Sequence, residues 1–251
     1  MKIVAIVQAR MSSTRLPGKV LLDLEGRPLI QRVVDKVLCS NVDEVVVATT
    51  TSVNDDKLVE WCKDNSISFF RGSENNVLKR YYECAKSYGA DIVVRVTSDD
   101  PFKDSFVINK AIDILIGSQY DYVSNTIHPT FPEGVDIEVF TFGALKECFN
   151  NAVLYSEKEH VTPYIWKNDG VFSLYNFTYE ENLSSLRWTI DYKEDLDFSR
   201  AVYKYLKHKK CFLMEDVLSI LKQHPELYDL QKVVVRNEGY IGSIKGERVD
   251  N

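Results

Sequence analysis

Short apolar runs alternate with helical stretches over the first half of the chain, and this alternation constrains the fold more than any other feature. Each run lacks the polar alternation of a half-buried strand, so each is typical of a parallel strand covered on both faces. The four runs are Ile3–Val7, Glu44–Ala48, Ile67–Phe70 and Asp91–Val96.

The segments that separate these runs have the apolar spacing of helices. They are Pro28–Leu38, Asp55–Lys63, Asn75–Tyr88 and Ser105–Ile116. This succession predicts an α/β fold, a doubly wound and mostly parallel sheet with right-handed crossovers. Ligands of such sheets bind beyond the carboxyl ends of the strands. The loops to inspect therefore follow Val7, Ala48, Phe70 and Val96.

The second half of the chain has a different pattern. Residues 120–142 are rich in Tyr, Val, Thr, Phe and Pro, which indicates strands and a hairpin. The later elements that we expect are a helix over Glu157–Lys167, strands near Val171–Phe177 and Leu186–Ile190, and a helix over Asp191–Leu206. We predict one domain over residues 1–232, with an inserted element at about 120–180, and a loose tail over 233–251.

Charge, apolar content and cysteine usage restrict the class of protein. A formal charge of −6 argues against a nucleic-acid-coating surface, although a locally basic pocket stays compatible with it. No stretch approaches about 18 apolar residues, so we expect no membrane segment. The five cysteines are scattered and include no C-x-x-C, which predicts reduced thiols in a cytoplasmic protein rather than a disulfide framework or a zinc site.

The loop after the first apolar run reads QARMSSTRLPGK and concentrates hydroxyls and cations. It matches neither G-x-G-x-x-G nor G-x-x-x-x-G-K-[ST]. Arg10 and Arg15 can still make forked bonds to phosphate, and Lys19 can supply a point charge. The Pro17-Gly18 turn would let Lys19 fold back. The loop therefore suits a triphosphate, and the alternative interpretation is an ordinary solvated βα loop.

The run QARMSSTRLPGKVL resembles the N-terminal signature of the sugar cytidylyltransferases, in particular the branch of the spore coat polysaccharide biosynthesis proteins. Further similar runs follow in the same order and cover most of residues 1–200: RGSENNVLKRYYECA, DIVVRVTSDDPF, DYVSNTIHPTFPEGVDIEVF, EKEHVTPYIW and RWTIDYKEDL. The resemblance implies a nucleotide-diphospho-sugar transferase-like, Rossmann-like fold. It also implies transfer of CMP from CTP to an acidic sugar, release of pyrophosphate, and a homodimer formed through the inserted element.

A glycosyltransferase on a similar sheet is the alternative function. Such enzymes usually show Asp-x-Asp after a central strand, whereas Asp99 and Asp100 are adjacent here. They also rarely carry a first loop so rich in Arg and Lys. Both features favour the cytidylyltransferase.

The resemblance places a Mg²⁺ site at Asp99 and Asp191. Mg²⁺ prefers hard oxygens and keeps several waters, so two carboxylates suffice. Some relatives carry a further Asp where this chain has Thr189. Asp100 has the alternative role of bonding the loop backbone. Asp191 has the alternative role of a helix N-cap with Glu194 as its capping-box partner.

The remaining candidates fall into a nucleotide group and an acceptor group. The expected nucleotide-binding residues are Gln8, Ala9, Arg10, Ser12, Arg15, Lys19, Thr49, Thr50, Ser73, Arg80 and Ser98, and the expected catalytic residues are Arg10, Lys19 and Asp99. The expected acceptor-sugar contacts are Asn125, His128, Glu138 and His160. Thr49 and Thr50 have the alternative of ordinary strand ends, and each histidine that of a hydrogen-bonded structural residue. Asn75 and Asn76 stand where close relatives usually carry Asp.

Overall fold

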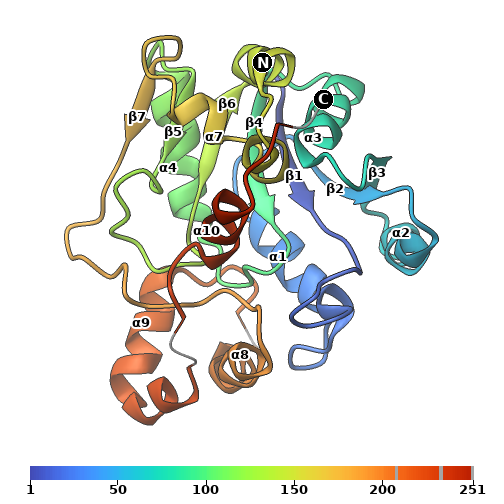
Figure 1. The fold of residues 1–251 in the computed structure, drawn as a ribbon. Helices are drawn as coiled ribbons and strands as arrows, with labels where there is room; N and C mark the ends of the chain where they lie inside the picture. The colour runs from blue at the N-terminus through green and yellow to red at the C-terminus, as the bar shows by residue number, and fades with distance from the viewer. Residues whose placement is uncertain (207–208, 232–233, 250–251) are drawn as a thin grey trace.

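The computed structural model describes residues 1–206, 209–231 and 234–249, which form a seven-stranded sheet in the order β3-β2-β1-β4-β6-β5-β7 (Figure 1). The strands are β1 (Ile3–Gln8), β2 (Glu44–Thr50), β3 (Ser68–Gly72), β4 (Ile92–Thr97), β5 (Tyr122–Ser124), β6 (Glu138–Thr141) and β7 (Leu174–Asn176). Strands β1 to β4 pair in parallel, and β6 is antiparallel to both of its neighbours. The predicted fold class, α/β with a mostly parallel sheet, is confirmed.

Helices cover both faces of the sheet. The α-helices are α1 (Leu29–Val37), α2 (Asp56–Asp64), α3 (Val77–Ser87), α4 (Ser105–Ile116), α5 (Phe142–Asn151), α6 (Tyr155–His160), α7 (Pro163–Trp166), α8 (Lys193–Leu206), α9 (Met214–Gln223) and α10 (Glu238–Lys245). Three short 3₁₀ helices are η1 (Lys19–Leu21), η2 (Val53–Asp55) and η3 (Pro225–Leu230). The helix predicted over Ser105–Ile116 has the bounds of α4.

Each strand feeds two separate cores because successive side chains point to opposite faces. In β1, Ala5 and Val7 belong to the core beneath α1, α4, α8 and α9, whereas Val4 and Ile6 belong to the core beneath α3 and α5. All four side chains are fully buried. This explains why the sequence shows a continuous apolar run rather than an alternating one.

The segment from 120 to 180 extends the same sheet. β6 pairs with β4, and β5 and β7 follow outward from it. The predicted helix Glu157–Lys167 is two helices, α6 and α7, because the chain turns between them. Val161 has a positive φ of 72°, which is strained for a β-branched residue and ends α6.

Two expectations about the C-terminal third are wrong. Leu186–Ile190 is extended but forms no strand, and its one ladder contact is a bridge from Arg187 to Glu133. The expected loose tail contains helix α10, which packs against α6. The proposed boundary at 232/233 and the last two residues of the tail, 250–251, lie outside the described residues.

The prediction of reduced thiols is wrong for one pair of cysteines. Cys39, after α1, is bonded to Cys211, before α9, across 172 residues of sequence and with a Cα–Cα distance of 5.8 Å. Cys62, Cys84 and Cys148 are free and buried. Sequence spacing could not reveal the pair because only the tertiary fold brings α1 next to the α8–α9 connection.

Gly134 marks a close approach of two backbone segments. Its φ is +105°, and a Cβ atom at this position would lie 2.8 Å from the Trp188 carbonyl carbon. The Glu133 N–H donates to Leu186 O at 2.9 Å, and the Trp188 N–H donates to Glu133 O at 2.7 Å. Only glycine fits such an approach without moving the neighbouring chain.

Candidate active site

The loop after β1 is held in place by a carboxylate that the sequence analysis did not single out. Asp55 accepts the Met11 N–H at 2.7 Å through one oxygen and bonds the backbone N–H and hydroxyl of Thr50 through the other. Gly18, in the left-handed region at φ 69°, donates its N–H to Met11 O at 3.0 Å and closes the loop. The turn at Pro17-Gly18 thus directs Lys19 back toward the sheet, as expected.

Lys19 is the cation at the centre of the site. Its Nζ lies 2.7 Å from Asp99 Oδ2, 2.8 Å from Asp191 Oδ1 and 2.8 Å from the carbonyl oxygen of Ile190. The side chain is 9% exposed. Burial lowers the pKa of Lys19, but Asp99 and Asp191 outweigh burial and raise it above its ordinary value. The ammonium group is therefore charged at neutral pH.

Asp191 is oriented by neighbours on both oxygens. Its Oδ1 accepts from Arg15 at 2.6 Å, in addition to Lys19, and its Oδ2 accepts from Arg187 at 3.0 Å. Burial raises the pKa of Asp191, but Lys19 and Arg15 lower it to about 2. The carboxylate stays ionised throughout the physiological range.

The expected helix cap at Asp191 has a different partner. Asp195, not Glu194, accepts the backbone N–H groups of Asp191 and Tyr192, each at 2.9 Å. Glu194 is exposed. The Asp191 carboxylate is thereby left free to point toward Lys19.

The two adjacent aspartates after β4 have separate roles. Asp100 Oδ2 accepts from Thr97 Oγ1 at 2.6 Å and pairs with Lys103 at 2.9 Å, so its side chain stabilises the loop through side chains rather than through the loop backbone. Asp99 faces Lys19 instead. The Ile190 N–H donates to Asp99 O at 2.9 Å, which ties the Asp99 and Asp191 segments together.

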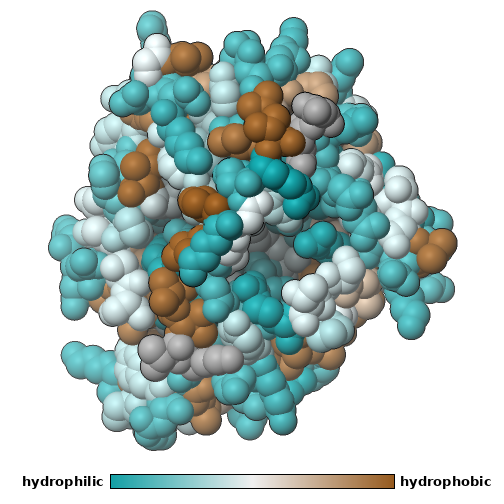
Figure 2. All heavy atoms as spheres, in the orientation of Figure 1, coloured by the Kyte–Doolittle hydropathy of each residue, from teal (hydrophilic) through white to brown (hydrophobic). Residues whose placement is uncertain are grey.

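Two cavities meet at these carboxylates, and Figure 2 shows the hollow on this face of the molecule. The first, the loop cavity, has a volume of about 340 Å³. Its lining includes Gln8, Ala9, Arg10, Arg15, Lys19, Arg80 and Ser98 of the expected nucleotide residues, and also Ser13, Thr14, Tyr155 and Glu159. The second, the sheet cavity, has a volume of about 450 Å³. Residues shared by both are Arg95, Thr97, Asp99, His160, Asp191 and Gly239.

The loop cavity is strongly cationic. It is lined by four guanidinium or ammonium groups from the expected set and by Arg95, against three carboxylates. Arg10 lies 3.4 Å from Glu159, a weak contact. Arg80 is buried, and its Nε has no hydrogen-bond partner. Such a lining suits a polyanion, because phosphate oxygens can take up the donors that the protein leaves weakly bound.

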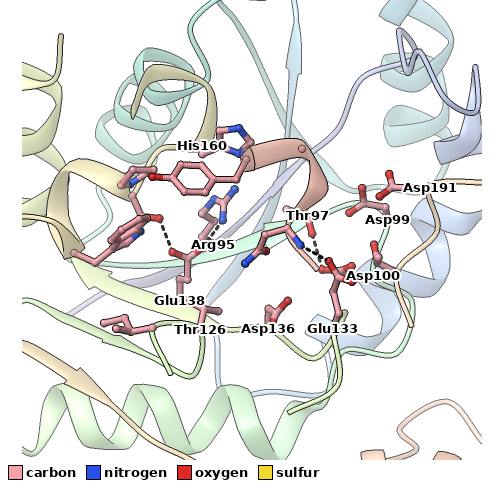
Figure 3. A pocket seen from close by; sticks show the side chains of 18 of the residues that line it. Arg95, Thr97, Asp99, Asp100, Thr126, Glu133, Asp136, Glu138, His160 and Asp191 are labelled. Carbon is pink, nitrogen blue, oxygen red and sulfur yellow. Dashed lines mark hydrogen bonds and ion pairs between the residues drawn. The ribbon is translucent and has the colours of Figure 1, made fainter. Parts of the chain in front are cut away.

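The sheet cavity is built around a buried ion pair. Arg95 pairs with Glu138, whose other oxygen accepts from Tyr122 at 2.7 Å and from Thr162 (Figure 3). His160 Nε2 lies 2.9 Å from Ser243 Oγ. Burial and Arg95 lower the pKa of His160 to about 4, so the imidazole is neutral at physiological pH. Figure 3 shows Glu138, Arg95 and His160 toward one end of the cavity and Asp99 with Asp191 at the other.

Several expected site residues line neither cavity. Ser12 and His128 are exposed, and Thr49, Thr50 and Asn125 are fully buried. The Asn125 side chain bridges Val135 O at 3.0 Å and the Ile137 N–H at 2.8 Å. Ser73 Oγ accepts the Asn76 N–H at 3.1 Å at the start of α3. The side chains of Thr50, Ser73 and Asn125 therefore bond to the protein itself. The Thr49 hydroxyl has no hydrogen-bond partner.

Sequence reasoning missed Arg95, Glu133, Asp136, Trp166 and Tyr240, all of which line the sheet cavity. A signal existed for Arg95, a charged residue inside the apolar run DIVVRV. Tyr240 lies in the segment expected to be a loose tail, and its sequence context gave no signal of a site residue. Asp136 pairs with Arg236, and burial raises the pKa of its carboxyl to about 6.

The donor set at Lys19 fits a hard cation. Two carboxylate oxygens and one carbonyl oxygen converge on the ammonium group, and hard oxygens of this kind are the ligands that Mg²⁺ prefers. Thr189 also lines the sheet cavity. Within the described ranges, no group of three or more His, Cys, Asp or Glu side chains could hold a metal. The two-carboxylate Mg²⁺ site at Asp99 and Asp191 stays a prediction.

None of the helices in the described part of the chain is both long and apolar enough to cross a membrane.

Comparisons with known proteins show the family and the fold of the chain. The model of the family described as "Cytidylyltransferase" matches residues 4–237. The spore coat polysaccharide biosynthesis protein SpsF of Bacillus subtilis is 31% identical over 89% of this chain and 95% of its own. The solved structure of a cytidylyltransferase from Leptospira borgpetersenii has a TM-score of 0.88 and 34% identity, and the match covers 94% of this chain and 100% of that one.

A more distant structure shows the same fold. It is a CMP:2-keto-3-deoxy-manno-octonic acid synthetase complexed with CTP, with a TM-score of 0.64 at 16% identity, covering 82% of this chain and 99% of that one. With a family model that spans nearly the whole sequence and two relatives above 30% identity, the chain belongs to the cytidylyltransferase family.

Proposed function

We propose that the protein transfers CMP from CTP to an acidic sugar and releases pyrophosphate. The observation that carries the proposal is the meeting of two cavities at Asp99 and Asp191, with the cationic loop cavity on one side and the sheet cavity on the other. The triphosphate would occupy the first and the sugar the second. The α-phosphate would then lie at the junction, where both substrates can meet.

The chain's own residues would position the reactants and neutralise charge. In the reaction a sugar hydroxyl oxygen forms a bond to the α-phosphorus, and the bond from that phosphorus to the pyrophosphate oxygen breaks. Negative charge grows on the phosphate oxygens as the bonds change. Arg10 and Arg15 would hold the triphosphate, and Lys19, at the junction, would neutralise the growing charge. Gln8, Ala9, Arg80 and Ser98 complete the proposed nucleotide contacts.

Asp99 and Asp191 would hold a Mg²⁺ ion. When bound, such an ion neutralises phosphate charge and orients the triphosphate. The convergence of three oxygens on the Lys19 ammonium supports a cation at this place. Lys19 would have to yield part of its contact with the carboxylates to the ion and bind phosphate oxygens in return.

Glu138 and His160 would contact the acceptor. Glu138 holds Arg95 toward the sheet cavity, and the neutral His160 can donate or accept one hydrogen bond to a sugar hydroxyl. Arg95 lines both cavities and its Nε has no partner, so it is the cation best placed to attract an acidic group on the sugar.

Pyrophosphate release tests the proposal. The protein is incubated with each of the four nucleoside triphosphates, Mg²⁺ and a panel of acidic, neutral and phosphorylated sugars. The expected result is release with CTP and an acidic sugar, and none when either is omitted. Equal pyrophosphate release with all four nucleotides would contradict the proposal. Pyrophosphate release with neutral sugars and not with acidic ones would also contradict it. Replacing Mg²⁺ by a chelator should abolish the signal.

The cellular setting stays a set of predictions. We expect a cytoplasmic homodimer that serves surface polysaccharide or spore coat synthesis and binds neither nucleic acid nor membranes. Val171 and Tyr175, in the segment expected to dimerise, are exposed apolar side chains, which supports an interface there. Sedimentation equilibrium tests the dimer, and cell fractionation tests the location. The family match favours this function over the glycosyltransferase alternative.

A further inference from the structure

The C-terminal segment 236–248, here called the strap, runs across the front of the molecule in Figure 1 and contributes lining residues to both cavities. Asn237 and Tyr240 line the sheet cavity, Ser243 lines the loop cavity, and Gly239 lines both. Helix α10, which forms most of the strap, has no buried residue. The strap is therefore a wall of both proposed substrate sites, and the ring of Tyr240 packs there edge-on against His160 and Trp166.

Polar contacts hold the strap at both ends. At its start, Arg236 pairs with Asp136, and the Asn237 N–H donates to Glu133 Oε1 at 3.0 Å. At its end, Glu247 accepts from the backbone N–H and hydroxyl of Ser156 at 3.0 and 2.6 Å. The middle is held by the contact of Ser243 with His160 at 2.9 Å and by the contacts of Glu238.

Glu238 connects the middle of the strap to the nucleotide loop. Its Oε2 lies 3.2 Å from Arg15 Nη1 and accepts from the Tyr192 hydroxyl at 2.8 Å. The other terminal nitrogen of Arg15, Nη2, lies 2.6 Å from Asp191 Oδ1. The guanidinium group proposed to bind phosphate is thus occupied by two carboxylates of the protein.

The contact closes a chain of ion pairs around the candidate metal ligand. Glu133, which holds the start of the strap, pairs with Arg187 at 2.7 Å, and Arg187 pairs with Asp191 at 3.0 Å. Asp191 pairs with Arg15, and Arg15 pairs with Glu238. The strap is therefore linked to Arg15 and to Asp191 through ion pairs.

We propose that Glu238 is a positioning residue for Arg15 and an internal competitor of the triphosphate. In the absence of nucleotide its carboxylate holds the guanidinium group in place and keeps the strap over the cavities. The triphosphate takes the place of Glu238 on Arg15, so that the contact between the strap and the loop after β1 is released. This inference rests on the proposed function, because it needs Arg15 to bind phosphate.

Exposure and charge favour such an exchange. The Arg15 and Glu238 side chains are 33% and 44% exposed, and an ion pair so exposed contributes little, so it yields easily to a stronger partner. A phosphate group carries more charge than a carboxylate and can also bond the guanidinium group by its forked geometry. The Glu238 carboxylate in addition repels the incoming triphosphate, since both are anions.

The decisive variant is Glu238→Gln, with Glu83→Gln as its matched control. Glu83 has a similar exposed fraction, 39%, and a similar weak ion pair with Lys79 on α3, but it lines neither cavity. CTP binding in the presence of Mg²⁺ is measured by calorimetry, and KM and kcat by pyrophosphate release. Circular dichroism and thermal melting check that both variants fold.

Glu238→Gln is expected to lower the Kd and KM for CTP by about two- to fivefold, with the acceptor KM and kcat changed less. Glu83→Gln is expected to leave both unchanged. In an Arg15→Gln background, which binds CTP more weakly, Glu238→Gln should have no further effect on the Kd, because the two residues act through one contact. The twofold to fivefold gain should also shrink as the salt concentration rises.

The outcomes separate the two proposals. Normal CTP binding by the wild type together with an unchanged or raised Kd in folded Glu238→Gln would overturn the role of Glu238 alone. An equal gain in the Arg15→Gln background would overturn it as well. A wild-type protein that binds no CTP would overturn the proposed function and this inference with it.

Discussion

Lys19 and Asp99 form a direct contact across the junction of the two cavities, with Nζ 2.7 Å from Oδ2. They come from the loop after β1 and the loop after β4, which are neighbouring strands in the sheet. Lys19 makes the same contact with Asp191 from a third segment. One ammonium group therefore joins three stretches of chain at the place where the reaction is proposed to occur.

Asp99→Asn is expected to lower kcat by at least about 10²-fold while the fold survives, because a neutral amide is a poor ligand for Mg²⁺. Asn has the same shape as Asp, and Asp191 would still neutralise Lys19. The measurement is pyrophosphate release, with circular dichroism as the test of folding. Asp113→Asn, on the exposed face of α4, is the control and should be as active as the wild type. Near-normal turnover by folded Asp99→Asn would rule out this role.

Lys19→Met should lower kcat and kcat/KM together by about 10²-fold or more, as expected for a lost transition-state contact. Met keeps the length of the side chain and removes its charge, and Arg15 can still hold the triphosphate. Steady-state kinetics with CTP provides the measurement. If only the KM for CTP rose and kcat stayed the same, Lys19 would be a docking residue, and the catalytic contribution would lie with Arg10, Arg15 and the metal.

Replacing both Cys39 and Cys211 by Ser is expected to lower the free energy of unfolding by about 2–5 kcal/mol, because the bond closes a long loop in the unfolded chain. Denaturant unfolding with and without a reductant measures the change. The wild type should lose stability on reduction, and the double variant should not respond. Activity is expected to survive, since none of the five cysteines lines either cavity. An equal response of both proteins to the reductant would contradict the bond.

His160 is expected to make folding stability depend on pH. Its pKa is about 4 in the folded chain, below the ordinary value of about 6.5, so the unfolded chain binds the proton more readily between these values. The contribution is therefore full above pH about 6.5 and is lost as the pH falls toward 4. Asp136, with a raised pKa of about 6, gives the opposite slope.

The contribution of His160 is therefore measured as the difference in stability between the wild type and a variant that lacks this histidine. Urea unfolding of the wild type and of His160→Gln is compared across this pH range, and the variant should lose less stability on acidification. His128→Gln, at an exposed position, is the control and should follow the wild type. A variant curve parallel to that of the wild type would show that His160 titrates normally.

The sequence predicted the sheet well because its evidence is local. The apolar run at Ile3–Val7 and the helical spacing of Ser105–Ile116 are each readable within one element, and both elements are present. The loop after β1 could likewise be interpreted from its own residues. Lys19 reaches Asp99 because β1 and β4 are neighbours in the sheet, and it reaches Asp191 because the Ile190 N–H donates to Asp99 O.

Contacts outside a residue's own helix or strand account for most of what was missed. Thr50 looked like a ligand because it ends a strand, yet Asp55 takes its hydroxyl. Arg95 depends on Glu138, 43 residues later. Helix α10 buries no side chain, so its sequence lacks the apolar periodicity by which helices are found. Thr50 and Arg95 thus have partners that lie outside their own strands.

The contact of Gly134 with the backbone of Trp188 has a consequence for how this enzyme can diversify. At Gly134, a wall of the sheet cavity touches the segment that leads to Asp191, and no side chain lies between the two backbones. A substitution that reshapes this wall would therefore also displace the Asp191 carboxylate. Divergence toward new acceptors is therefore restricted on that side. The strap meets the same cavity through the side chain of Tyr240, so a substitution at this position need not move the backbone that leads to Asp191. Its sequence is where lineages with different acceptors would be expected to differ first.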